Sequence, residues 1–115
     1  MTAEQNNIYG TLYLCATPIG NLEDMTQRAL RMLQEADLIA AEDTRHTLQL
    51  LNHFNIKGRL VRYDEHSKDK QGEYLLGQLL EGKNVALVSD AGFPGIADPG
   101  EALAHDAIAH GIRVV

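Results

Sequence analysis

The sequence predicts an α/β domain built on a mostly parallel β-sheet of about five strands, with helices on both faces. Short apolar runs alternate with segments of helical periodicity along the whole chain, which is typical of βαβ units with right-handed crossovers. One apolar run, residues 85–88 (VALV), is uninterrupted, as expected for a strand that is covered on both faces. With 115 residues, 44% of them hydrophobic, the chain is long enough for a single domain with a real core.

The first half of the chain contains two predicted strands, each followed by a helix. Residues 9–16 form the first strand, which a Thr-Pro-Ile-Gly-Asn turn ends. Asp24 is expected to cap the first helix, with Gln27 as its capping-box partner. Residues 37–41 form the second strand and run directly into a charged stretch, residues 42–46 (EDTRH). The predicted inward faces are Ala29, Leu30, Met32, Leu33 and Ala36 in the first helix, and Leu48, Leu51 and Phe54 in the second.

The second half repeats this alternation. Residues 59–63 form a weaker third strand, and the charged residues 64–72 are expected to be an exposed loop. Gly82 ends the third helix. After the fourth strand, residues 98–101 (DPGE) place an N-cap Asp, a first-turn Pro and a Glu at the start of the last helix. Gly111 ends that helix, and a fifth strand begins just after it. The predicted inward faces are Leu75, Leu76, Leu79 and Leu80, then Ala102, Leu103, Ala107 and Ile108.

Charge and composition exclude several classes of protein. The net charge of -6 gives no electrostatic support for a free-standing RNA or DNA binder, because such proteins gain affinity by neutralising phosphates. The single cysteine, Cys15, cannot form an internal disulfide, and its apolar surroundings indicate a buried, inert thiol in a reducing compartment. No secretory signal is visible, and no apolar run approaches the ~20 residues that span a bilayer, so we expect a cytoplasmic protein without a membrane partner.

Residues that shape binding loops gather at one predicted edge of the sheet. In open parallel sheets, ligands bind outside the carboxyl ends of the strands. Three loops follow strands there, at residues 17–21, 42–45 and 89–100. The third loop begins with Asp90, which comes directly after a buried strand and needs a polar partner, whereas Asp98 is explained by capping. The loop's glycines permit close backbone approach and its prolines stiffen it: Gly92, Gly95 and Gly100, and Pro94 and Pro99.

Several familiar sites are not supported by the sequence. The first strand is not followed by G-x-G-x-x-G, and no G-x-x-x-x-G-K-[ST] is present, so the dinucleotide and P-loop interpretations lose their main support. The histidines outside residues 42–46 show no metal-ligand spacing with acids or Cys15, so no metal site is expected.

The stretch of residues 42–46 has two interpretations, which the sequence leaves open. It contains Asp43 and Arg45, so a carboxylate could activate a substrate hydroxyl and a guanidinium group could contact a phosphate. Alternatively, Asp43 is simply the N-cap of the helix that follows, and Arg45 is a solvated surface residue.

The three loops together resemble a known family. The stretches TPIGNLEDMTQRAL, AAEDTRHT and ALVSDAGFPGIADPG, in this order and spacing, are similar to those of the tetrapyrrole methylase family. They resemble most closely its branch that methylates the 2′-hydroxyl of a cytidine in small-subunit ribosomal RNA. The resemblance extends from Leu12 to Val115. It implies an S-adenosylmethionine-dependent methyltransferase with two α/β domains, of which residues 1–115 are the N-terminal one. This agrees with a chain whose last strand has only just begun at Val115.

The resemblance also implies which residues contact the cofactor. The cofactor would lie between the two domains, against Pro18 and Ile19 after the first strand and Asp90, Ala91, Gly92 and Phe93 after the fourth. The catalytic candidates are Asp43 and Arg45, chosen for their position and not from the resemblance. The isolated domain is expected to be inactive, and small-subunit ribosomal RNA is the expected partner of the whole protein, with a homodimer also allowed. The alternatives are a methyltransferase acting on a tetrapyrrole or corrin, and a non-catalytic α/β binding module.

Overall fold

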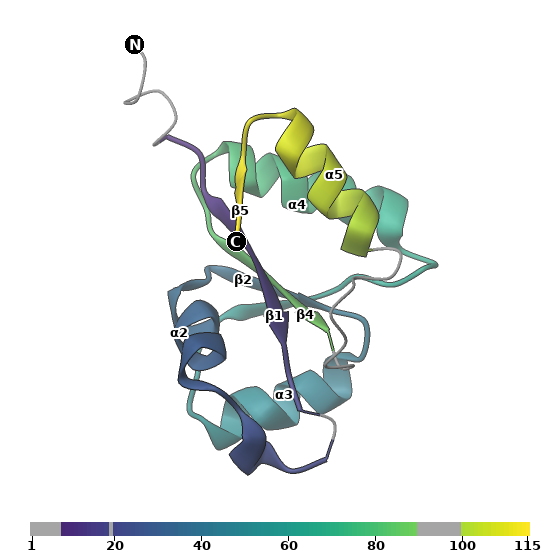
Figure 1. Ribbon diagram of the computed structural model, residues 1–115. Helices are drawn as coiled ribbons and strands as arrows, with labels where there is room; N and C mark the ends of the chain where they lie inside the picture. Colours follow the sequence, from purple (N-terminus) through teal and green to yellow (C-terminus); the bar gives the residue numbers. More distant parts are fainter. Residues whose placement is uncertain (1–7, 19, 90–99) are drawn as a thin grey trace.

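Five parallel strands form one sheet in the computed structural model, which describes residues 8–18, 20–89 and 100–115 (Figure 1). The strand order is β3-β2-β4-β1-β5, so β1 and β2, which follow each other in the chain, are separated by β4. The predicted α/β class with about five mostly parallel strands is therefore confirmed. The strands are β1 (Thr11–Ala16), β2 (Leu38–Ala41), β3 (Arg59–Arg62), β4 (Val85–Ser89) and β5 (Arg113–Val114).

Helices cover both faces of this sheet, as predicted. In Figure 1, α4 (Lys68–Leu80) and α5 (Gly100–Ala109) lie above the sheet, and α2 (Gln27–Glu35) and α3 (Thr44–His53) lie below it. Side chains alternate along β4, so the strand contributes to a separate core on each face of the sheet. Val85 and Leu87 pack with α4 and α5, while Ala86 and Val88 pack with α2 and α3. All four are buried, which explains the uninterrupted apolar run.

The start of α2 differs from the prediction. Asp24 does not cap this helix but ends a short 3₁₀ turn, η1 (Leu22–Asp24), which Asn21 caps. The cap of α2 is Thr26, whose Oγ1 accepts a hydrogen bond from the backbone N–H of Ala29 at 3.0 Å. The extra turn places the helix start two residues later than expected, because Thr26 takes the extended backbone conformation that a cap requires.

Two leucine-sized side chains that were predicted to face inward are exposed. Leu48 of α3 is 49% exposed and Ile108 of α5 is 63% exposed. In α3 the buried residues are Thr47, Leu50 and Leu51, so Leu48 lies one position, about 100°, away from the buried stripe. The predicted inward positions Leu51, Leu75, Leu79 and Leu103 are buried.

The prediction of a loop at residues 64–72 is wrong for residues 68–72, which are helical. Helix α4 begins at Lys68, and its first two turns are charged because they form an exposed face of the helix. Gly82, with φ of +98°, follows α4 and ends it as predicted. The predicted N-cap Asp98 lies outside the described residues.

Asn84 holds the amino-terminal edge of the sheet together. Its backbone carbonyl accepts from the N–H groups of Asp37 and Leu38, and its own N–H donates to the Asp37 carboxylate. Its side-chain Oδ1 accepts from the N–H of Thr11 at 2.9 Å, and its Nδ2 donates to the carbonyl of Glu35 at 3.4 Å. One residue before β4 therefore joins the starts of β1 and β2, which are not neighbours in the sheet.

Candidate functional site

The carboxyl ends of three strands meet at one edge of the sheet. Ala16 at the end of β1 is level with Ser89 of β4, and Ala41 at the end of β2 is level with Val88. The N–H and the hydroxyl of Thr17 both donate to the Ser89 carbonyl, at 2.9 and 3.3 Å. Thr17 is buried, so the chain leaves β1 in a fixed direction directly beside the end of β4.

Only part of the predicted cofactor site falls within the described residues. Pro18 follows the anchored Thr17 and is half-buried at this edge. The other five predicted cofactor contacts lie outside the described residues, so they remain predictions: Ile19, Asp90, Ala91, Gly92 and Phe93.

The turn between β2 and α3 brings both catalytic candidates to the same edge. Asp43 caps α3, because its Oδ1 accepts a hydrogen bond from the backbone N–H of His46 at 3.1 Å. The capping interpretation is therefore confirmed, and it leaves the second carboxylate oxygen for another partner. Arg45 lies in the first turn of α3 and is exposed, and within the described residues it forms no ion pair. No cation of the described chain is paired with Asp43 either.

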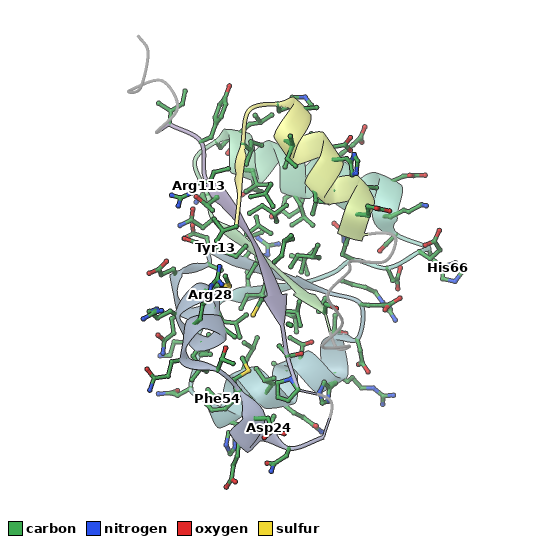
Figure 2. The ribbon with its side chains drawn as sticks, in the orientation of Figure 1. Tyr13, Asp24, Arg28, Phe54, His66 and Arg113 are labelled. Atoms are coloured by element: carbon green, nitrogen blue, oxygen red, sulfur yellow. The ribbon has the colours of Figure 1, made fainter. Side chains whose placement is uncertain are left out.

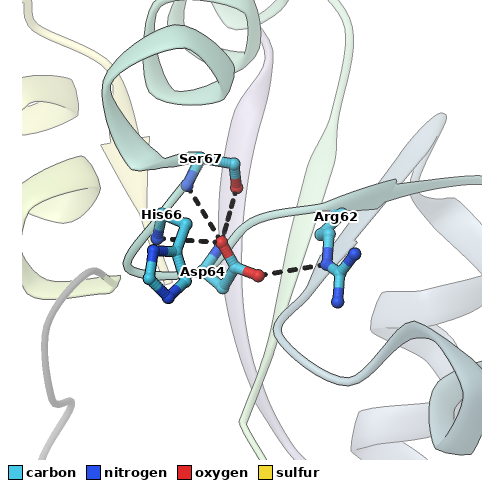
Figure 3. A network of polar contacts seen from close by, with 4 residues as sticks. All are labelled: Arg62, Asp64, His66 and Ser67. Atoms are coloured by element: carbon cyan, nitrogen blue, oxygen red, sulfur yellow. Dashed lines mark hydrogen bonds and ion pairs between the residues drawn. The ribbon is translucent and has the colours of Figure 1, made fainter.

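The turn between β3 and α4 is a second polar structure at this edge, and the sequence analysis missed it (Figure 3). Asp64 Oδ1 accepts from the backbone N–H of His66, the backbone N–H of Ser67 and the Ser67 hydroxyl, at 3.0, 2.9 and 2.9 Å. Its Oδ2 binds Arg62 Nε at 3.0 Å. The Ser67 hydroxyl holds the pKa of Asp64 below its usual value, helped by the two N–H groups and Arg62. The pattern Asp-x-x-Ser after a strand was the signal that could have indicated this turn.

The starts of α2, α3 and α4 at this edge are already occupied by the chain's own oxygen atoms. Thr26 caps α2, Asp43 caps α3, and the Asp64 carboxylate binds the N–H groups before α4. A phosphate that sought one of these three helix N-termini would meet a side chain, and in two cases a negative charge. The starts of α2, α3 and α4 therefore do not favour a phosphate ligand.

Two buried groups near this edge take no part in an evident reaction. Cys15 is buried as predicted, and burial raises the pKa of its thiol to about 11, which disfavours the reactive thiolate. Thr47, on the first turns of α3, is 1% exposed, and its hydroxyl is the buried side-chain oxygen without a hydrogen-bond partner in the described structure. The described residues contain no group of three or more His, Cys, Asp and Glu that could hold a metal ion.

A groove of about 460 Å³ between α4 and α5 adjoins the β3–α4 turn. Tyr63, Leu76 and Ala102 contribute its apolar lining, and Asp69, Glu73 and Asp106 contribute carboxylates. Elsewhere, Tyr13, Arg28 and Arg113 lie on the side of the molecule away from His66 (Figure 2), and the Tyr13 hydroxyl donates to Glu35. Arg45 and Arg62, which are exposed at the carboxyl edge beside α3, are therefore a separate group from Arg28 and Arg113.

Known proteins resemble this chain over almost its full length. A family model described as Tetrapyrrole (Corrin/Porphyrin) Methylases matches residues 11–115. The chain is 59% identical to Ribosomal RNA small subunit methyltransferase I of Halalkalibacterium halodurans, over 97% of this chain and 39% of that protein. It is 56% identical to the protein of the same name from Escherichia coli O157:H7, over 96% of this chain and 38% of that one. The chain thus spans well under half the length of these relatives.

A solved structure shares the fold. It is the uroporphyrin-III C-methyl transferase from Thermus thermophilus complexed with S-adenyl homocysteine, with a TM-score of 0.68 and 23% sequence identity. The match covers 91% of this chain and 46% of that one. At this identity the similarity shows the architecture alone. None of the helices in the described part of this chain is long and apolar enough to cross a membrane.

Proposed function

The chain belongs to the tetrapyrrole (corrin/porphyrin) methylase family, and on this basis we propose that the whole protein methylates small-subunit ribosomal RNA. The observation that carries the proposal is 59% identity to a ribosomal RNA small subunit methyltransferase over 97% of this chain. The site proposed for methylation is the 2′-hydroxyl of a cytidine. Because the chain spans 39% of that relative, we assign it the role of an N-terminal domain, with a second domain completing the enzyme. The reaction takes place in the cytoplasm, where the RNA is.

We propose S-adenosylmethionine as the cofactor, which supplies the methyl group. The described residues fit S-adenosylmethionine in one respect. The starts of α2, α3 and α4 are occupied by the chain's own oxygens, and this cofactor carries no phosphate that would need a helix start. The solved neighbour with S-adenyl homocysteine supports the same class of ligand. Pro18 and Ile19 on one side, and residues 90–93 on the other, would hold the cofactor. The hydrogen bonds from Thr17 to Ser89 hold together the ends of β1 and β4, the described residues that precede these two segments.

Asp43 and Arg45 are the proposed catalytic residues. The substrate oxygen must be aligned with the methyl group, and losing its proton helps the displacement. The Oδ1 of Asp43 is engaged by the His46 N–H, which fixes the carboxylate in place. Its second oxygen then accepts the hydrogen bond of the ribose hydroxyl, while Arg45 contacts the substrate from the first turn of α3.

The test is methyl transfer from radiolabelled S-adenosylmethionine by the whole protein. The acceptors are small ribosomal subunits from a strain that lacks the gene, and uroporphyrinogen as the tetrapyrrole alternative. We expect label in the RNA, at the 2′-oxygen of a cytidine, and none in uroporphyrinogen. Label in uroporphyrinogen alone would replace the proposal by the tetrapyrrole reaction, and label in neither would favour a non-catalytic binding module.

Calorimetry with S-adenosylhomocysteine tests the division into domains. We expect tight binding to the whole protein and little or none to the isolated 115-residue chain. Equal binding to both would place the pocket within these loops alone. Methyl transfer by the isolated chain would contradict the assignment of half a site to it.

A further inference from the structure

Arg62 lies beside the catalytic candidates, on the same face of the sheet. The register pairs Arg62 with Ala41, the last residue of β2, so the β2–α3 turn begins next to it. Side chains alternate along β3: Val61 packs with α4 and α5, and Leu60 packs with α2 and α3. Arg62, two residues after Leu60, therefore faces the side of α3, and α3 begins at this same edge with Thr44 and Arg45.

The guanidinium group of Arg62 is held in one orientation. Its Nε donates to Asp64 Oδ2, while Asp64 Oδ1 is fixed by three hydrogen bonds from His66 and Ser67. Figure 3 shows Asp64 between Arg62 on one side and His66 and Ser67 on the other, with the terminal amino groups of Arg62 turned away from Asp64. The Arg62 side chain is 67% exposed, and within the described chain those amino groups have no partner.

A phosphate is the ligand that this arrangement fits. The two amino groups of a guanidinium match two oxygens of a phosphate, and an arginine that is already oriented loses less entropy on binding. The chain carries a net charge of -6, so general electrostatic attraction does not bring RNA to this domain. Any attraction that this domain itself has for RNA must then come from specific contacts by cationic side chains.

The surroundings favour the α3 side of the β3–α4 turn over the other side. The groove between α4 and α5 is lined by three carboxylates, those of Asp69, Glu73 and Asp106, and by one cation, Lys68, so its net negative charge repels a phosphate. On the α3 side, Arg62 and Arg45 are both exposed at the carboxyl edge, so two cations stand there against the two exposed carboxylates of Glu42 and Asp43.

We propose that Arg62 binds a phosphate of the RNA backbone, and that Asp64 is the positioning residue that orients it. The proposal rests on the ribosomal RNA methyltransferase function proposed above, and it adds a substrate contact to that site. Arg62 helps to hold the RNA and does not take part in the transfer of the methyl group.

The experiment compares Arg62→Ala and Asp64→Asn in the whole protein, with Arg59→Ala as the matched control. Arg59 is an exposed arginine on the same strand, at the opposite edge of the sheet. For Arg62→Ala we expect KM for small ribosomal subunits to rise about tenfold, with kcat and KM for S-adenosylmethionine within about twofold of wild type. The slope of the logarithm of RNA affinity against the logarithm of salt concentration should decrease by about one, as expected for the loss of one phosphate contact.

Asp64→Asn should raise KM for the RNA about threefold, and adding it to Arg62→Ala should change KM no further, because both act through one contact. Arg62→Lys, which keeps the charge but loses the paired donors, should fall between wild type and Arg62→Ala. If Arg62→Ala and Arg59→Ala have the same KM and salt dependence while the wild type methylates the RNA, the inference is overturned and the proposed function stands. If the wild type transfers no methyl group to RNA, both are overturned.

Discussion

The two edges of the sheet use their polar residues differently. At the amino-terminal edge, Asn84 directs its side chain and backbone to other parts of the chain, namely Thr11, Glu35 and Asp37. At the carboxyl edge, Asp43 and Asp64 also bind backbone N–H groups, but each stands beside exposed arginines. The first edge is closed by hydrogen bonds within the fold, whereas the second is stabilised and still presents charged groups to a ligand.

At the carboxyl edge, the capping contacts are compatible with the proposed functional roles. The Asp43 cap occupies one carboxylate oxygen, and the Asp64 network occupies both oxygens but leaves the amino groups of Arg62 outward. A side chain that is held by the backbone is oriented more precisely for a substrate than a solvated one. A residue's structural role is therefore no argument against its functional role here.

The largest expected effect separates the two roles of Asp43. Asp43→Asn keeps a side-chain oxygen for the His46 N–H but removes the carboxylate, so stability should hold while methyl transfer by the whole protein falls about 100-fold. Asp43→Ala should lose the same activity and in addition about 1 kcal/mol of stability. The measurements are kcat with saturating RNA and unfolding in urea. Normal methylation by either variant would remove Asp43 from the catalytic residues.

The next effect tests the amino-terminal edge. Asn84→Ala leaves the part-buried N–H of Thr11 without its acceptor, so we expect a loss of about 1–3 kcal/mol in the free energy of unfolding. The KM and kcat of the folded enzyme should not change, because the substitution is at the edge away from the site. Lys83→Ala, at the exposed neighbouring position, is the control and should be close to neutral. A normal stability for Asn84→Ala would show that this edge is not held as described.

The smallest effect concerns the pH dependence of the Asp64 turn. The pKa of Asp64 lies below its usual 3.8, chiefly because the Ser67 hydroxyl donates to it. A lowered pKa means that the carboxylate contributes its full stability above pH 3.8 and loses it as the pH falls through the lowered value. The melting temperature of wild type should therefore exceed that of Asp64→Asn by a constant amount near neutral pH, and the difference should shrink below pH 3.8.

Ser67→Ala removes the main cause of the shift and should move this loss of stability to higher pH. Circular dichroism melts from about pH 7 to about pH 3 would measure both variants. If the difference in melting temperature between wild type and Asp64→Asn does not change with pH, the Asp64 carboxylate does not stabilise this turn through its charge.

The fold could be predicted from the sequence because the signals for it are local. The uninterrupted run VALV and the alternation of strands and helices identified a covered parallel sheet, and Gly82 marked the end of α4. The cap of α2 was misplaced because Asp24 and Thr26 are both good caps, and only the intervening turn after Asn21 decides between them.

The site was predicted less completely, because it depends on contacts between distant segments. The position of Asp43 after a predicted strand placed it at the carboxyl edge, where the structure has it. Composition suggested a solvated loop at residues 64–72, since a run of charges carries no sign of which carboxylate binds which N–H group. Asn84 was overlooked for the same reason: its partner Thr11 is 73 positions away in the chain. The cofactor contacts at Ile19 and at residues 90–93 remain predictions.

The strand order has a consequence for how the domain is made in the cell. A ribosome synthesises β1 and β2 early, yet their shared neighbour β4 emerges only with Val85–Ser89. Until then, β1 lacks both strands that it pairs with, β4 and β5, whereas β2 can already pair with β3. Non-local pairing of this kind slows folding and exposes strand edges during synthesis. The order of synthesis therefore leaves β1 open to wrong pairing until the central strand takes its place.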